Sequence, residues 1–148
     1  MSYENPWIYE NKAVDSEIID QYIGFVYIIT NTITNRKYIG KKLLKRSKTK
    51  RINGKKKRSA VESDWKQYYG SNKQLLTDCE TYGYYNFKRQ ILRLCKTKGE
   101  CSYYEAKYQF ENDVLEDDNF YNVWIMVRVN KKHLNKGDIN GQNTKKEN

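Results

Sequence analysis

The pattern of apolar and polar positions predicts three β-strands in the central part of the chain. Residues 25–30 are apolar, β-branched and aromatic, residues 31–35 supply turn-forming side chains, and residues 37–39 resume the strand pattern. This arrangement predicts a β-hairpin that starts at Gly24. Residues 87–94 predict a third strand, mostly apolar but interrupted by three cations: Lys88, Arg89 and Arg93.

Two further segments follow a helical period. Ser71 can cap a helix that Gly83 is placed to end, with apolar residues one turn apart at Leu75, Leu76, Cys79 and Tyr82. A second helix should begin near Ser102 and end around residues 116–118, with one apolar stripe of Tyr103, Ala106, Phe110 and Val114. We therefore expect an α+β fold: a small central antiparallel β-sheet, built on the N-terminal hairpin and the third strand, flanked by α-helices.

The remaining segments are less regular. Residues 1–22 contain five acidic residues and one lysine and predict an extended N-terminal arm ending in a helical turn, and residues 121–129 are a candidate final strand. Residues 131–148 are rich in Lys, Asn and Gly and predict a flexible basic tail. At 148 residues the chain is long enough for one domain, which we expect over residues 23–130.

Composition excludes several classes of protein. Three cysteines without a Cys-x-x-Cys pair indicate neither a disulfide framework nor a zinc knuckle, and we expect them in the core. No stretch approaches the roughly 18 apolar residues of a membrane span, and the first residues do not resemble a signal peptide. The sequence therefore predicts a soluble, cytoplasmic protein.

The net charge of +10 is concentrated in one segment. Residues 41–58 contain eleven cations and no acid, while the rest of the chain has 17 basic and 18 acidic residues. Such a segment favours a polyanionic partner, because cations near phosphates release condensed counterions. We interpret residues 41–62 as a DNA-binding insertion with these candidate contacts: Lys41, Lys42, Lys45, Lys48, Arg51, Lys55, Lys56, Lys57 and Arg58.

Two other interpretations of this segment stay open. It could be a solvated loop without a partner. It could also lie on an anionic membrane surface, although Leu43, Leu44 and Ile52 are the only large apolar residues that could face the lipid.

Catalytic chemistry is constrained by the single histidine, His133, which excludes nucleases that depend on several histidines. A site that cuts phosphodiesters still needs a base for water, a cation or metal for the phosphate, and a carboxylate to hold that metal. Tyrosine, lysine or arginine, and glutamate could fill these roles.

The first hairpin carries a family motif. Gly24-Phe25-Val26-Tyr27, ten further residues, then Tyr38-Ile39-Gly40 resembles the GIY-YIG nuclease family, which includes phage homing endonucleases, some restriction enzymes and the incision subunit of bacterial excision repair. The first triplet departs from the motif, because its glycine lies one position early. Further pieces resemble phage-borne members across residues 24–125: Tyr69-Gly70-Ser71, Tyr82-Gly83, Asn86-Phe87-Lys88 and Tyr121-Asn122.

The resemblance implies a metal-dependent DNA endonuclease, of the phage homing or Seg-like kind, that acts on double-stranded DNA in the host cytoplasm. It implies Tyr27 as general base, assisted or replaced by Tyr38, and Glu105 as ligand of Mg²⁺ or another divalent cation such as Mn²⁺. Gly40 and Asn122 would support the site. The family's arginine has no exact counterpart here, and we expect Arg46 to replace it, with Lys42 and Lys48 as contenders.

Simpler explanations exist for the same residues. Ser102-x-x-Glu105 fits a helix capping box, and Glu105-Ala106-Lys107 fits part of a nuclease fold that would place Glu105 on a strand. The two tyrosines could be ordinary half-buried strand residues. Pairing with residue numbers that sum to 65 would put Tyr27 opposite Tyr38 on one face, whereas a sum of 66 would put them on opposite faces.

Two non-enzymatic functions also fit the sequence. The chain could bind nucleic acid without cutting it, with Trp65, Tyr68 and Tyr69 stacking on bases. It could instead be an antitoxin-like or host-takeover protein that binds another protein through its acidic arm and tyrosine-rich surface.

Overall fold

The computed structural model describes residues 3–128 and 130–134 and has an α+β fold. A mixed five-stranded sheet runs in the order β2-β1-β7-β3-β4. Its strands are β1 (Ile8–Tyr9), β2 (Lys12–Ala13), β3 (Gly24–Asn31), β4 (Lys37–Leu43) and β7 (Phe87–Cys95). The three central strands are antiparallel, as expected, and the sheet is mixed because β1 pairs with β7 in parallel.

The hairpin formed by β3 and β4 agrees with the sequence pattern. Asn35 takes a positive φ of 67° in the turn, and the Asn31 side chain accepts a hydrogen bond from the Ile33 amide. Tyr27 pairs with Gly40 and Ile29 with Tyr38, so paired residue numbers sum to 67. Neither expected register is correct. The observed one still leaves Tyr27 and Tyr38 on the same face, as diagonal neighbours, because side chains alternate with a period of two.

Helix α1 (Lys73–Tyr82) lies where the sequence predicts it, with Gly83 at its end. Its cap is Asn72 rather than Ser71, since the Asn72 side chain accepts a hydrogen bond from the Leu75 amide. Helix α2 (Lys98–Glu111) begins earlier and ends earlier than predicted. Thr97 caps the helix, so the helix begins before Ser102, where the sequence pattern placed its start.

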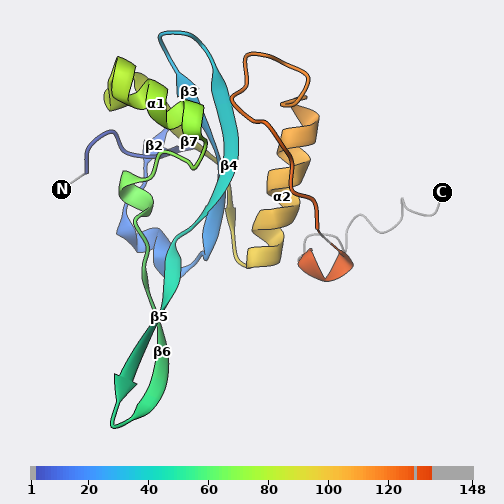
Figure 1. The fold of residues 1–148 in the computed structure, drawn as a ribbon. Helices are drawn as coiled ribbons and strands as arrows, with labels where there is room; N and C mark the ends of the chain where they lie inside the picture. The colour runs from blue at the N-terminus through green and yellow to red at the C-terminus, as the bar shows by residue number, and fades with distance from the viewer. Residues whose placement is uncertain (1–2, 129, 135–148) are drawn as a thin grey trace.

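The central sheet is covered on both faces, as Figure 1 shows for α1 and α2. Phe25, Tyr27 and Ile29 project to the side that packs against Leu75 and Cys79 of α1. Val26 and Ile39 belong to the opposite core, which also includes Cys95 at the end of β7, Cys101 on α2 and Val114 after α2. All three cysteines are buried, as expected.

The N-terminal residues are part of the fold rather than a separate arm. Trp7 is fully buried, and its indole nitrogen donates a 2.8 Å hydrogen bond to the carbonyl of Trp65. The expected helical turn is the 3-10 helix η1 (Ser16–Asp20). The strands β1 and β2 have two residues each, which is too short for an alternating sequence pattern to reveal them.

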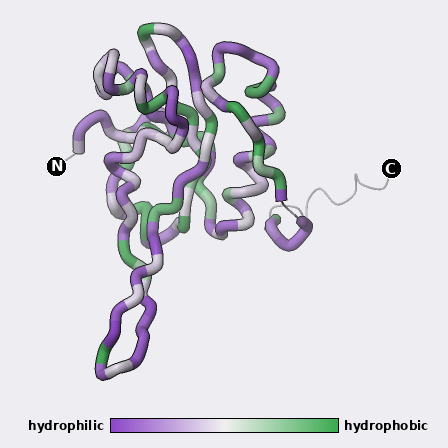
Figure 2. The backbone as a smooth tube through the Cα atoms, in the orientation of Figure 1, coloured by the Kyte–Doolittle hydropathy of each residue, from purple (hydrophilic) through white to green (hydrophobic). Residues whose placement is uncertain are grey.

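The basic segment forms a second, two-stranded sheet of β5 (Lys45–Ile52) and β6 (Lys55–Glu62). It extends from the body of the molecule and is almost entirely hydrophilic (Figures 1 and 2). The 3-10 helices η2 (Trp65–Gln67) and η3 (Tyr84–Asn86) flank α1 along the chain.

The predicted final strand is absent from the described part of residues 121–129. Residues 121–128 have no regular secondary structure, and Phe120 makes only an isolated bridge to Lys37. Lys131–His133 form the short 3-10 helix η4, whereas residues 135–148 of the predicted tail lie outside the described residues. Within the described part of the chain, no helix is long and apolar enough to cross a membrane.

Candidate active site

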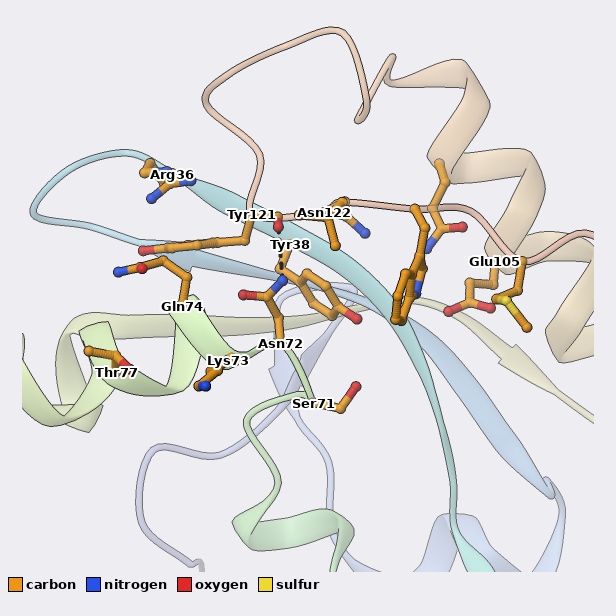
Figure 3. A pocket seen from close by; sticks show the side chains of 14 residues that line it. Arg36, Tyr38, Ser71, Asn72, Lys73, Gln74, Thr77, Glu105, Tyr121 and Asn122 are labelled. Atoms are coloured by element: carbon orange, nitrogen blue, oxygen red, sulfur yellow. Dashed lines mark hydrogen bonds between the residues drawn. The ribbon is translucent and has the colours of Figure 1, made fainter.

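A cavity of about 610 Å³ opens between β4, the start of α1, helix α2 and the segment after Phe120. Three residues expected at the site line it: Tyr38, Glu105 and Asn122. Figure 3 shows them with the cavity's other labelled residues, several of them from the start of α1. The full lining is Arg36, Tyr38, Ser71, Asn72, Lys73, Gln74, Thr77, Glu105, Gln109, Tyr121, Asn122, Val123, Trp124 and Met126.

Tyr38 is the tyrosine that faces the cavity. Burial raises the pKa of its phenol, the neighbouring Ser71 hydroxyl opposes that rise, and Tyr68 and the negative charge of Glu105 add to it. A hydroxyl that donates to a phenolate stabilises the deprotonated form. Ser71 therefore matters for the chemistry of Tyr38, a role that its interpretation as a helix cap did not suggest.

Tyr27 lies beneath the cavity and does not line it. Its side chain is 1% exposed, and its ring centroid is 6.2 Å from that of Tyr38. Burial, together with the neighbouring Tyr68 and Tyr38, raises the pKa of the Tyr27 phenol well above its usual value. Tyr27 is thus not the half-buried residue of the simpler interpretation. It is a fully buried tyrosine packed against a half-buried one.

Gly40 explains how the two tyrosines approach each other. A β-carbon at this position would lie 2.5 Å from the Tyr27 hydroxyl oxygen and 2.9 Å from a ring carbon of Tyr38. Any side chain at Gly40 would therefore push the pair apart. The glycine of the second motif triplet is required by this close packing.

Glu105 lies in the interior of α2, with its carboxylate 3.3 Å from the Lys41 ammonium. Its side chain is 15% exposed, and burial raises the pKa of its carboxyl although Lys41 opposes the shift. The capping-box interpretation is wrong, because the amide capped at this helix is that of Glu100, by Thr97. The alternative fold is also excluded, since it requires Glu105 on a strand.

Asn122 holds the outer edge of β4. Its side chain accepts a hydrogen bond from the Ile39 amide (3.1 Å) and donates one to the Ile39 carbonyl (2.9 Å), as a neighbouring strand would. Gln109 also donates to this carbonyl, at 2.9 Å. These contacts fix the strand that carries Tyr38 and Gly40.

Arg46 does not line the cavity. It is exposed on β5 and pairs with Val61 in the hairpin, as Lys48 pairs with Ser59. Lys42 lies closer to the tyrosines: its ammonium is 2.6 Å from Asp64 and 4.1 Å from the ring centre of Tyr68. The sequence predicted a cation at the site from the number of residues that separate Arg46 and Lys48 from Tyr38. Both residues instead lie on the β5–β6 hairpin, which extends away from the body (Figure 1).

The cavity contains two cations that the sequence did not indicate, Arg36 and Lys73. The guanidinium of Arg36 lies 4.2 Å from the ring centre of Tyr121, and Tyr121 donates a 2.7 Å hydrogen bond to Asp78. Lys73 is the first residue of α1, held beside the cavity because Asn72 donates a hydrogen bond to the Tyr121 carbonyl. The contacts of Tyr121 with Arg36 and with Asn72, at the start of α1, bring these residues together.

Few residues could hold a metal here. Within residues 3–128 and 130–134 there is no cluster of three or more His, Cys, Asp or Glu side chains. Glu105 is the one carboxylate in the cavity lining, and Gln109 lies one turn further along the same face of α2. Any metal bound at this cavity would have a small set of protein oxygen ligands.

Comparison with known proteins identifies the family. The family model described as "Putative endonuclease segE, GIY-YIG domain" matches residues 7–125, which is most of the chain. No curated protein and no solved structure matches the chain. The matched region includes the tyrosine hairpin, Glu105 and Asn122. This chain therefore belongs to the GIY-YIG nuclease family and contains a domain of the segE endonuclease type.

Proposed function

We propose that this protein is a metal-dependent endonuclease that hydrolyses phosphodiester bonds in double-stranded DNA. One observation carries the proposal: Tyr38, Glu105 and Asn122, which come from three separate elements, line one cavity, and Tyr27 packs directly beneath Tyr38. We further propose a phage homing or Seg-like role, which is supported only by the description of the matching family.

The donor set at the cavity fits a hard divalent cation. Glu105 is a largely buried carboxylate with one ion-pair partner among the described residues, and its raised pKa reflects incomplete compensation of its charge. The side-chain oxygen of Gln109 is buried and has no hydrogen-bond partner in the described part of the chain. Mg²⁺ prefers such oxygen ligands and keeps several waters, for which the cavity has room. When bound, Mg²⁺ or Mn²⁺ would polarise the scissile phosphate and stabilise the leaving oxygen.

We assign proton transfer to the tyrosine pair. Tyr38 faces the cavity, so its oxygen, as a phenolate, is the one in position to take a proton from the attacking water and so return to the phenol. The neighbouring Ser71 hydroxyl would favour that phenolate before the transfer. Tyr27 is buried below and would act through Tyr38, holding its ring in place. The family resemblance implied Tyr27 first as general base. In this proposal Tyr38 is the base and Tyr27 positions it.

Charge on the phosphates would be balanced by different cations at different places. Lys41 lies beside Glu105, while Arg36 and Lys73 line the cavity. Arg46 and Lys48 lie on the hairpin and would contact the DNA backbone farther away. We therefore prefer Lys41, Arg36 and Lys73 to Arg46 as cations near the reacting phosphate.

The test is nicking of supercoiled plasmid with and without Mg²⁺. The variant Glu105→Gln removes the charge with little change of shape, and Glu111→Gln on the exposed last residue of the same helix is the matched control. We expect Glu105→Gln to lose on the order of a hundredfold or more of the nicking rate, and the control to retain it. If every preparation binds DNA and none shows metal-dependent nicking, the proposal of an endonuclease is wrong.

A protein that only binds nucleic acid is the second candidate, favoured by the cationic β5–β6 hairpin. Its proposed stacking residues weaken it, because Trp65 is fully buried and both Tyr68 and Tyr69 pack against the core. The protein-binding alternative gives residues 41–58 no role in binding nucleic acid. Loss of binding on that deletion would count against it.

A further inference from the structure

The β5–β6 hairpin is a free-standing ribbon. Asn53 and Gly54 both have positive φ, at 54° and 77°, which is the conformation of a two-residue type I′ turn. Its strands pair only with each other, over eight successive residue pairs. Eight residues at about 3.3 Å each give the ribbon a length of about 26 Å. The tip is therefore far enough from the body to contact a partner by itself.

The pairing register assigns each cation to one face of the ribbon, because directly opposite residues project to the same side. In the outer half, one face carries three cations: Arg51, Lys56 and Arg58. The other face carries three more: Lys50, Lys55 and Lys57. None of these six forms an ion pair with a carboxylate of the described residues. The outer ribbon is thus equally cationic on its two faces.

We propose that the outer half of this hairpin inserts into the major groove of double-stranded DNA, with each face toward the phosphates of one strand. The proposal rests on the proposed DNA substrate and adds the groove and the orientation. A ribbon that lay flat on DNA would use one cationic face and leave the other in water. A groove presents phosphates on both sides, which matches the observed distribution.

Dimensions select the major groove. A two-stranded β-ribbon is one of the elements that the major groove of B-DNA admits. The major groove of B-DNA is about 12 Å wide, whereas the minor groove is about 6 Å wide. The tip is unobstructed by the rest of the molecule, because a β-carbon at Gly54 would meet nothing within 4 Å. The deep, narrow major groove of duplex RNA would not admit the ribbon.

The ribbon's own energetics also favour an anionic partner. Lys50 lies directly opposite Lys57, and Arg51 opposite Lys56. Like charges in these positions destabilise an antiparallel pair, and an isolated two-stranded hairpin is marginally stable in water. Phosphates on both sides remove this repulsion, so the hairpin becomes more ordered when it binds.

The first test compares two variants that each lose three charges from one face. These are Arg51→Gln/Lys56→Gln/Arg58→Gln and Lys50→Gln/Lys55→Gln/Lys57→Gln. The expected result is that each lowers the slope of log affinity against log salt by about 2 to 3, because each released phosphate contact contributes about 0.9. The control is Lys88→Gln/Lys98→Gln/Lys107→Gln, which removes three exposed charges from the body and should change the slope much less. An effect confined to one face, or equal for the control, overturns the proposal.

The second test is dimethyl sulfate protection of a DNA duplex by the full-length protein without divalent metal. Guanine N7 lies in the major groove and adenine N3 in the minor groove. We expect protection of guanine N7 by the wild type that is lost in both triple variants. Protection of adenine N3 alone, or equal competition by duplex RNA of the same length, overturns insertion into the major groove.

These outcomes separate the two proposals. Plasmid nicking together with minor-groove protection would support the endonuclease proposal and contradict the inference about the hairpin. Major-groove protection in a protein that never nicks would do the reverse.

Discussion

The body of the molecule and its β5–β6 hairpin are stabilised in different ways. In β3, Phe25, Val26, Tyr27 and Ile29 are almost completely buried, so packing holds the strand and everything attached to it. In β5, from Arg46 to Ile52, every residue is exposed. The hairpin has its turn and its backbone pairing, but it has no core. Rigidity is thus concentrated where bonds would be broken, and charge is concentrated where DNA would be held.

This difference implies that cutting and binding can be separated by mutation. A catalytic constellation needs side chains fixed by packing and hydrogen bonds, which the central sheet provides. Phosphate contacts tolerate motion, because long Lys and Arg side chains interact with charge over several ångströms. The following experiments would break or sharpen this division.

The largest effect should come from Tyr38→Phe. Loss of the phenol that faces the cavity removes the proposed proton acceptor and should lower the nicking rate by about 10²–10⁴-fold, with DNA affinity unchanged. Tyr27→Phe is the matched variant from the buried layer and should cost less. Single-turnover nicking and binding at equal salt measure the two effects. A greater loss with Tyr27→Phe would return the role of base to that residue.

Truncation of the hairpin should have the next largest effect. Replacing residues 47–60 by Asn-Gly joins the paired residues Arg46 and Val61 through a two-residue turn and removes seven cations. We expect the salt slope of DNA binding to fall by up to about 6. The unfolding temperature of the body should stay the same, and nicking should persist at low salt. A body that unfolds on truncation would contradict its independence from the hairpin.

Core truncation should be costly in the body only. Phe25→Ala should lower the free energy of unfolding by about 3–5 kcal/mol, because it leaves a cavity among Trp7, Tyr27 and Trp65. Ile52→Ala, at a residue that is 46% exposed near the tip of the ribbon, should change it by less than about 0.5 kcal/mol. Denaturant unfolding compares the two. Similar losses would show that the hairpin packs on the body in solution.

Removal of the Asn122 side chain tests how β4 is held. Asn122→Ala leaves the Ile39 amide without its partner and should cost about 1–3 kcal/mol of stability. Nicking should fall as well, because Tyr38 and Gly40 flank Ile39. Asn119→Ala, at an exposed neighbour, is the control. If both variants have the same stability and activity, the Asn122 contacts do not position the strand.

The smallest effect should be on pH dependence without metal. Because the pKa of Glu105 is raised in the folded state, its contribution to stability is greatest below the usual glutamate pKa of about 4.3 and declines as pH rises through the raised value. Glu105→Gln avoids this decline and should be more stable than the wild type at pH 7 but not at pH 4. Thermal unfolding in EDTA measures the difference. A variant that is equally stable or less stable at pH 7 would contradict a poorly compensated carboxylate.

Addition of Mg²⁺ extends the same experiment. A cation bound by the folded state raises its stability by mass action. The wild type should gain thermal stability with Mg²⁺, and Glu105→Gln should not. Equal gains would place the metal elsewhere.

Some of the site could be predicted from local patterns alone. The alternation around Tyr27 and Tyr38, the turn at Asn35 and the helical stripe around Glu105 each depend on a few neighbouring residues. The elements they predict are present, with displaced ends for α2. The register of the hairpin was wrong by two or by one, because turn length sets strand pairing in a way that apolar spacing does not encode.

Other features depended on distant partners. The buried position of Trp7 and the pairing of β1 with β7 involve residues about 60–80 apart in the chain. Residues 121–129 have strand-like composition, but the described ones form no strand because Asn122 satisfies the edge of β4 with its side chain. The charge of the basic segment could be predicted from the sequence, but its hairpin could not. A ribbon without a core has no alternation of apolar and polar residues.

The sequence by itself determined the family, the tyrosine hairpin, the helical carboxylate and the concentration of positive charge, because these follow from residue identity and short-range periodicity. The tertiary structure alone decided which tyrosine faces the cavity, that Lys41 pairs with Glu105, and that Arg36 and Lys73 rather than Arg46 line the site. It also decided which cations share a face of the ribbon. Burial, register and long-range contact set these outcomes, and none of them can be read from neighbouring residues along the chain.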